Sequence, residues 1–359
     1  MINRPPKLVA TMLSGNAEST IEAAILSAMD WVDAICLIDT GITDATLEKA
    51  TAVAGGMLSL SKFAWCNDFA MARNAALAAA DHSQATWAMT LDTDERLEFT
   101  DFDHKAQLIE ALEAPDVMAW MVTERDGSYS KERFIRIPSS LRWHGRTHEA
   151  LTVREARERK RLDGCRFWET RKSPVDFQRK LERDVVILLN ETAADPQNAR
   201  WWYYLGQTYE GMKLWRPAVD AFDRCARMDQ WPVESSWACY SAARCLSELQ
   251  EYRRAEEYCA LGMTRKPRAP ETPWLAGWCC FQRRAFDEAV AWSRMAVFLA
   301  QQGQLSEEIG FHHVPAWFEG PYDVLRFALR ELGQLEEAEL AEIEFEISKT
   351  ERFALFPCG

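Results

Sequence analysis

The sequence lacks several features that would mark other classes of protein. Its 359 residues contain no apolar run approaching the ~18 residues of a membrane-spanning helix, so we expect no such helix. The N-terminal residues lack the apolar core and cleavage site of a secretory signal, and we expect a cytoplasmic protein. Positive charge is in deficit, because 42 Lys and Arg face 55 Asp and Glu and leave a net charge of −13. This balance argues against a nucleic-acid partner.

The ten cysteines form no CxxC pair and no Cys/His spacing suited to zinc. They are scattered through apolar helical patterns, so we expect small buried residues in a reducing compartment. Ten of the fifteen tryptophans lie between Trp168 and Trp317, and the two halves of the chain therefore differ in composition. This difference and the length of the chain predict about two domains.

The first half alternates apolar strands with helical patterns. Runs at residues 8–13, 34–38 and 87–91 have the character of buried strands, and helical spacing separates them. The alternation predicts a mostly parallel sheet with helices on both faces. Each run ends in a polar cluster, at residues 14–16, 39–41 and 92–94. Because ligands bind beyond the carboxyl ends of such strands, we expect the three clusters to converge on one edge.

Asp92 and Asp94 stand two positions apart at the end of an apolar strand. Hard divalent cations prefer a few carboxylates and complete their shell with water and substrate phosphates. The pair therefore suits a metal that bridges a diphosphate, with an acidic pair in a solvated loop as the alternative.

Four segments in order resemble family 2 glycosyltransferases with the GT-A fold. Residues 39–46 (DTGITDAT) resemble the DxGSxDxT signature of that family, and residues 63–74 the FxWxDDFxxARN segment of one subgroup. Residues 91–95 (LDTDE) are similar to its LDxDE, and residues 14–18 to a diverged VKNEE. Departures at Ala17 and Ile42 affect donor contacts more than the fold. The resemblance implies an α/β GT-A (Rossmann-like) catalytic domain over residues 1–172.

The same resemblance implies roles in binding the donor nucleotide. Asn16 is kept from the first motif, and Asp39 would contact the base or ribose. Arg73 would lie against the base or diphosphate, and Asp68 would help to fix that edge. Asp92 would meet the ribose or the metal.

Asp94 would be the principal ligand of Mn²⁺ or Mg²⁺, joined by Asp92. Residues 141–151 resemble the RFxGxVHExL block of the subgroup and supply His148 as a third ligand, with a structural histidine as the alternative.

The catalytic base stays open between Glu149, Glu124 and Asp126. An inverting displacement needs a carboxylate within hydrogen-bond reach of the acceptor, on the face opposite the leaving group.

Residues 125–183 are locally basic, with 17 Lys and Arg against 9 Asp and Glu. Within this segment, residues 154–161 are typical of a solvated helical or linker face. The alternatives are a ring of positive charge around the phosphates of the donor, and a surface that binds an anionic acceptor.

The second half repeats. Seven residues follow the spacing of a tetratricopeptide (TPR) unit: Trp202, Leu205, Gly206, Tyr209, Ala218, Phe222 and Pro232. Ala218 recurs as Ala255, Ala289 and Ala338, and the last, longer interval implies an insertion near residues 301–318 that we interpret as a contact loop. We therefore expect a linker helix over residues 173–195 and all-α TPR-like repeats over 196–359.

Together these features predict a metal-dependent inverting glycosyltransferase of the hexosyltransferase type. It would move a sugar from a nucleoside-diphosphate sugar, by the resemblance a UDP-sugar, to a protein, peptide or saccharide acceptor. The repeats would present the acceptor or form a homodimer. The domain order resembles that of bacterial TPR-containing glycosyltransferases such as the bacteriocin peptide S/O-glycosyltransferases.

Two alternatives stay open. One is a TPR interaction scaffold with an inactive GT-A domain, against which the intact Asp39, Asp92, Asp94 and His148 speak. The other is a nucleotidyltransferase on the same scaffold, which would need a Gly-rich phosphate loop with a Lys or Arg after the first strand.

Overall fold

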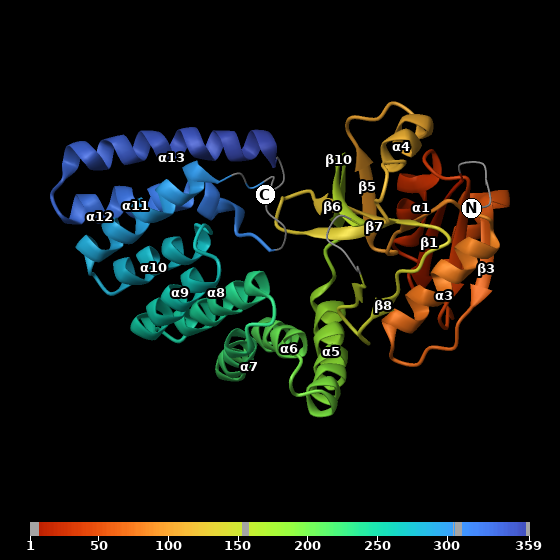
Figure 1. Ribbon diagram of the computed structural model, residues 1–359, viewed down its shortest axis with the longest axis horizontal. Coiled ribbons are helices and arrows are strands. Elements are labelled where there is room, and N and C mark those ends of the chain that lie inside the picture. Colours follow the sequence, from red (N-terminus) through yellow and green to blue (C-terminus); the bar gives the residue numbers. More distant parts are fainter. Residues whose placement is uncertain (1–6, 153–157, 304, 306–310, 357–359) are drawn as a thin grey trace. The chain divides into compact units, whose positions relative to one another are not determined.

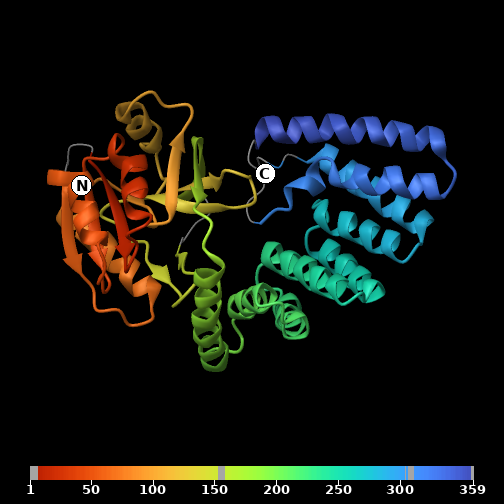
Figure 2. The same ribbon diagram turned by 180° about the vertical axis from the view of Figure 1, so that it is seen from behind.

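The computed structural model describes all residues except 1–6, 153–157, 304, 306–310 and 357–359 (Figures 1 and 2). The chain divides into two compact units. The first comprises residues 1–125 and 130–172, and the second residues 126–129 and 173–359.

The first unit is built on an eight-stranded mixed sheet with the strand order β3-β2-β1-β4-β7-β6-β10-β5. Its strands are β1 (Leu8–Ser14), β2 (Ala34–Asp39), β3 (Leu58–Lys62), β4 (Trp87–Thr90), β5 (Glu95–Phe99), β6 (Ala119–Glu124), β7 (Ser130–Arg136) and β10 (Arg159–Glu169). A two-stranded ribbon, β8 (Trp143–His144) with β9 (Ala150–Leu151), lies outside this sheet. The helices are α1 (Ile21–Met29), α2 (Thr46–Ala54), η1 (Gly55–Met57), α3 (Phe69–His82) and α4 (Lys105–Leu112).

The core of this unit forms around β1 and β4, whose apolar runs are buried on both faces of the sheet. Helix α3 packs on β1 and β2 through small side chains, including Ala72, Ala76 and Ala80. Alanine at these positions lets the helix lie close to the sheet without a large side chain between them.

The α/β class predicted from the sequence is confirmed, and the parallel arrangement holds for β1 to β4. Two strands differ from the expected parallel order, because β7 runs antiparallel to β4 and β5 antiparallel to β10. The solvated helical or linker face expected over residues 154–161 is wrong for residues 159–161, which begin β10. Residues 154–157 of that segment lie outside the described residues. Leu162, Cys165 and Phe167 are buried at intervals of three and two residues, across an irregularity in the register of β10, and their burial explains why the segment forms a strand.

The second unit is helical. Its helices are α5 (Pro174–Ala194), α6 (Ala199–Gly211), α7 (Trp215–Met228), α8 (Pro232–Glu248), α9 (Tyr252–Arg265), α10 (Glu271–Gln282), α11 (Phe286–Gln302), η4 (Val314–Trp317), α12 (Gly320–Glu331) and α13 (Leu335–Leu355). Consecutive helices from α6 to α13 pack in succession, as Figure 1 shows. The helix expected as a linker over residues 173–195 corresponds to α5, which packs on α6 and belongs to this unit.

The repeat read from the sequence corresponds to helix pairs. Ala218, Ala255, Ala289 and Ala338 are all buried, each in the second helix of a pair. Gly206 allows a close approach, because a Cβ at this position would lie 2.6 Å from the ring of Phe222. Small residues at these contacts let each pair close and share a continuous core with the next pair.

In the described part of the chain, no helix is both long and apolar enough to span a membrane.

Candidate functional site

The strand directions bring the predicted site segments to one edge of the sheet. Strands β1, β2, β4, β6 and β10 run the same way, whereas β5 and β7 run the opposite way. The ends of the first group and the beginnings of β5 and β7 therefore share one edge, which we call the carboxyl edge. The convergence predicted for residues 14–16, 39–41 and 92–94 follows from this topology.

Arg73 lies at the centre of the ionic contacts on this edge. Its Nη2 donates to both carboxylate oxygens of Asp92, at 2.9 and 3.2 Å, and its Nε donates to Glu149 Oε1. The guanidinium also lies over the ring of Trp143, 5.5 Å from the ring centroid. The indole Nε1–H of Trp143 is buried and has no hydrogen-bond partner among the described residues. Through the contacts of Arg73, the structure brings together the sequence motif that contains α3, the residues that follow β4 and the segment near residue 149.

The charges around Asp92 decide its protonation. Burial raises the pKa of Asp92, but the nearby charges of Arg73, Arg133 and Lys131 outweigh burial and hold this pKa well below its ordinary value. Asp92 is therefore an anion at neutral pH, and its carboxylate can accept hydrogen bonds or bind a cation.

Behind Asp92 lies a buried ionic cluster. Glu95 is fully buried; its Oε1 accepts from Lys131 Nζ at 3.0 Å and from Arg133, and its Oε2 accepts from the backbone N–H of Asp92 at 3.0 Å. Burial raises the pKa of Glu95, and the two cations oppose that rise. Lys131 also bonds Glu169. The cluster fixes the backbone at Asp92 and so positions the strand end.

Asp94 has a different partner. Its Oδ2 accepts from the ammonium group of Lys172, and the side chain of Asp94 is 26% exposed. The carboxylate is therefore accessible and already faces a cation. Burial lowers the pKa of Lys172, but the hydrogen bond to Asp94 outweighs it and raises this pKa above its ordinary value.

Asp39 and Asn16 order two loops of the same edge. Asp39 Oδ1 accepts from the backbone N–H groups of Ile42 and Gly41, each at 2.8 Å, and these bonds lower the pKa of Asp39. Asn16 Oδ1 accepts from the backbone N–H of Thr43 at 2.8 Å. The loops after β1 and β2 are therefore joined to each other.

Asp68 and His148 have local roles in the structure. Asp68 is the N-cap of α3, and its Oδ1 accepts from the backbone N–H of Met71 at 2.9 Å. His148 is half-buried between β8 and β9 and has a positive φ of 49°. In the part of the chain that the structure describes, Asp92, Asp94 and His148 do not bring three ligand atoms within 4.8 Å of one another.

The two remaining candidates for the base lie near the β6–β7 turn. Glu124 is the last residue of β6 and is half-buried at the carboxyl edge. Asp126 lies in the turn that follows, where its Oδ1 accepts from the backbone N–H of Ser128 at 2.8 Å, and this turn belongs to the second unit.

Residues 12–173 match the family model described as Glycosyl transferase family 2. The first unit is a family 2 glycosyltransferase domain. Its mixed sheet is GT-A-like, and the ionic contacts described above lie within the matched residues of this glycosyltransferase domain.

Other similarities concern TPR proteins. A TPR repeat-containing protein of Synechococcus elongatus is 28% identical over 131 residues, which cover 36% of this chain and 30% of that protein. The chain thus spans less than a third of the length of this curated relative. Solved structures of MamA (TM-score 0.40, 14% identity, 51% of this chain and 98% of that one) and of YrrB, a TPR protein with an unusual peptide-binding site (TM-score 0.36, 16% identity, 51% and 82%), are also similar. Both TM-scores are below 0.5, and the repeats of the second unit are seen in its own helix pairs.

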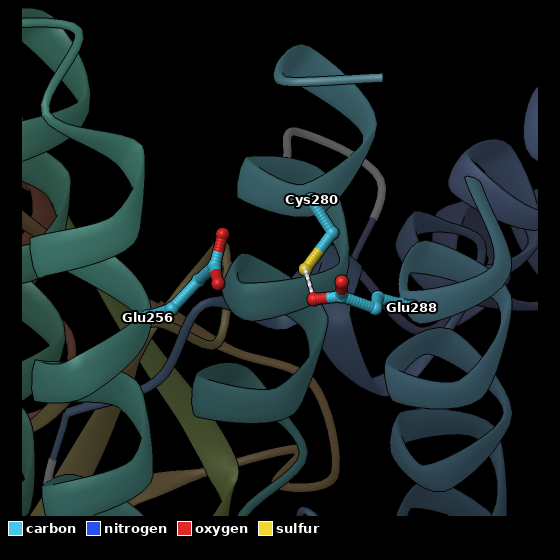
Figure 3. Close-up of side chains that lie close together, drawn as sticks. All are labelled: Glu256, Cys280 and Glu288. Atoms are coloured by element: carbon cyan, nitrogen blue, oxygen red, sulfur yellow. Dashed lines mark hydrogen bonds between the residues drawn. The ribbon is translucent and has the colours of Figure 1, made fainter. Parts of the chain in front are cut away.

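A separate group of potential metal ligands lies in the second unit. Glu256, Cys280 and Glu288 bring their ligand atoms within 4.8 Å of one another, and Figure 3 shows that they come together from neighbouring helices. Arg283 already donates to Glu256 at 2.6 Å, and also to Glu288. A single guanidinium therefore pairs with both carboxylates, and we interpret the group as an ionic contact between helices.

Sequence reasoning assigned no role to Glu95, Lys131, Arg133 or Lys172. Glu95 stood in the LDTDE motif, and the three cations lie in the basic segment 125–183. The excess of Lys and Arg over residues 125–183 was the feature of the sequence that could have indicated these cations. Only the strand order shows that β5, β7 and the segment after β10 bring these side chains to the carboxyl edge.

Proposed function

We propose that this chain is a metal-dependent inverting glycosyltransferase of the hexosyltransferase type. It transfers a sugar from a nucleoside-diphosphate sugar, and the family resemblance favours a UDP-sugar. The acceptor is a protein, peptide or saccharide. The observation that carries the proposal is the grouping of Arg73 with Asp92, and of Asp94 with Lys172, at the carboxyl edge of a family 2 domain.

The donor would lie across the ordered loops after β1 and β2. Asp39 and Asn16 hold these loops and would position the nucleoside, and Asp68 fixes the start of α3. Negative charge develops on the departing diphosphate, and Arg73 would be the cation that stabilises it. Because it bonds two carboxylates at once, the guanidinium is held in one orientation before the donor binds.

The carboxylates fit Mn²⁺ or Mg²⁺ in kind, since both ions prefer oxygen ligands. Asp94 would be the principal ligand, because its exposed oxygen already accepts a cationic donor. Asp92 and His148 would complete the protein ligands after a local rearrangement that brings them toward Asp94. When bound, such an ion neutralises charge on the diphosphate leaving group.

The base stays open between Glu149, Glu124 and Asp126. Glu149 bonds Arg73, Glu124 ends β6 at the carboxyl edge, and Asp126 accepts a bond from the backbone of its own turn. Each would act by taking a proton from an acceptor hydroxyl or thiol. The TPR-like helices would present the acceptor or form a homodimer.

The test is release of nucleoside diphosphate from a panel of nucleotide sugars, with and without Mn²⁺. Asp94→Asn should reduce metal-dependent release at least tenfold while leaving the thermal unfolding temperature within a few degrees of the original. Asp103→Asn is a matched control, because this exposed carboxylate follows the far end of β5, away from the carboxyl edge. Unchanged release in Asp94→Asn would refute the metal assignment. Absence of donor binding to the unmodified chain would favour the scaffold alternative.

A further inference from the structure

The second unit contains a cavity of about 720 Å³ that the proposed catalysis does not use. It is lined by the first helices of three successive pairs, α6, α8 and α10, and by His313. The volume falls within the range of roughly 300–1,000 Å³ that is typical of small-molecule sites. We call this cavity the repeat pocket.

Indole rings dominate one wall of the repeat pocket. Trp274 and Trp278 stand one turn apart on α10, so both project from the same side of that helix, and both are partly exposed. Trp215, at the start of α7, contributes a third indole. The face of an indole carries negative charge density and attracts positively polarised hydrogen atoms. Such a surface suits a ring with a face of C–H bonds.

The polar groups of the pocket balance in charge. Glu210 pairs with Arg244 at 3.1 Å, and Glu248 and Lys213 add one more group of each sign. The lining therefore offers hydrogen-bond donors and acceptors with no net charge. A ligand with many hydroxyl groups can use both kinds of partner, whereas a strongly charged ligand would meet a like charge.

Residues of the chain itself already cover part of a row of aromatic side chains, two of which, Tyr240 and Trp274, line the pocket. Tyr203, Tyr240 and Trp274 occupy equivalent positions in three successive pairs, at intervals of 37 and 34 residues. Phe311 lies beside Tyr203 with ring centroids 5.4 Å apart, and His313 stacks on Trp274 at 4.4 Å. An extended peptide that lay along this row would meet rings that are already covered. The space that remains is a compact pocket bounded by His313.

His313 is an uncharged aromatic wall at neutral pH. Burial and the charge of Arg244 lower the pKa of His313 to about 4. Its stacking on Trp274 shows that this indole accepts a flat ring against its face.

We propose that the repeat pocket binds a saccharide, with a sugar ring stacked on Trp278 and its hydroxyl groups bonded to Glu248 and Arg244. The identification of this saccharide as part of the acceptor rests on the proposed function; its binding does not.

The experiment measures binding of three neutral probes, chitotriose, cellotriose and mannotriose, to the full chain by saturation-transfer NMR without donor or metal. We expect at least one trisaccharide to bind, and we expect Trp278→Ala to weaken that binding at least tenfold. Trp231→Ala is a matched control, because this indole is 39% exposed and lies outside the pocket lining. Glu248→Ala should also weaken binding severalfold, and its exposed position makes a folding defect unexpected.

Three results would overturn the proposal: no trisaccharide binds, binding survives both Trp278→Ala and Glu248→Ala, or a lysine-rich peptide binds in place of the sugars in a Trp278-dependent manner. Asp94→Asn separates the two proposals, since it should reduce metal-dependent donor hydrolysis at least tenfold and leave trisaccharide binding unchanged. If the unmodified chain binds a trisaccharide but does not hydrolyse any donor, only the proposed function is refuted.

Discussion

At the scale of single residues, the carboxyl edge depends on side chains that serve two partners at once. Arg73 bonds Asp92 and Glu149, and Glu95 bonds two cations and a backbone N–H. Removing one member leaves buried charges without compensation, which costs more than the interaction itself contributes.

Arg73→Met should lower the free energy of unfolding by about 3 kcal/mol, because Asp92 and Glu149 would lose their shared cation. The lowered pKa of Asp92 gives stability that is present above its unfolded value near 3.8 and lost as the pH falls further. The difference between the original chain and the variant should therefore be largest at neutral pH and shrink below about pH 4.

Urea unfolding of both proteins at pH 7 and pH 3.5 measures this difference. Arg171→Met is the control, because Arg171 is exposed in the same segment of the chain as Lys172. A pH-independent difference would contradict the ionic role of Arg73.

At the scale of elements, the helix pairs depend on a few close contacts. Gly206→Ala would place a methyl group 2.6 Å from the Phe222 ring, which is fully buried and cannot move aside easily. We expect a loss of about 1–3 kcal/mol in the free energy of unfolding, typical of an overpacked core. Gly56→Ala is the matched control, because a Cβ there meets nothing within 4 Å. Equal stability of the two variants, measured by urea unfolding, would refute the close packing of α6 on α7.

The elements also show what the sequence could predict. Apolar runs identified β1, β2 and β4, and the alanine period identified the second helix of each pair. The charged beginning of β10 concealed the strand, because its buried residues, Leu162, Cys165 and Phe167, come later. Strand order is a long-range property, so the sequence did not show that β7, β6 and β10 lie between β4 and β5.

The candidate site likewise combines residues that the sequence predicted with contacts that it did not. The motifs predicted Arg73, Asp92 and Asp94, which the fold places at one edge. They did not indicate that Arg73 and Asp92 bond each other, or that Lys172 covers Asp94. These contacts join residues 19 and 78 positions apart, and local patterns carry no information about such pairs.

At the scale of the whole molecule, the thiols are distributed unevenly. Of the nine described cysteines, eight are buried and Cys66 is exposed. Burial raises the pKa of Cys239 to about 12 and that of Cys279 to about 11, which suppresses their thiolate forms.

A short treatment of the folded protein with a maleimide should therefore modify Cys66 well before the other described thiols. Peptide mapping by mass spectrometry identifies the modified positions. The same treatment in urea is the control and should modify all of them. Rapid labelling of Cys239 or Cys279 in the folded protein would show that the second unit opens readily.

The paired charges of the carboxyl edge have a consequence for kinetics. Arg73, Lys131, Arg133 and Lys172 each hold a carboxylate before any ligand arrives. A diphosphate that binds Arg73 or Lys172 would replace Asp92 or Asp94 as a partner, so each new ion pair forms as an old one breaks. Such an exchange changes the number of free charges little, so the donor affinity should depend only weakly on salt concentration. Discrimination between donors would then depend on how well each donor fits the positions that the carboxylates occupy, and not on the net electrostatic attraction of the site.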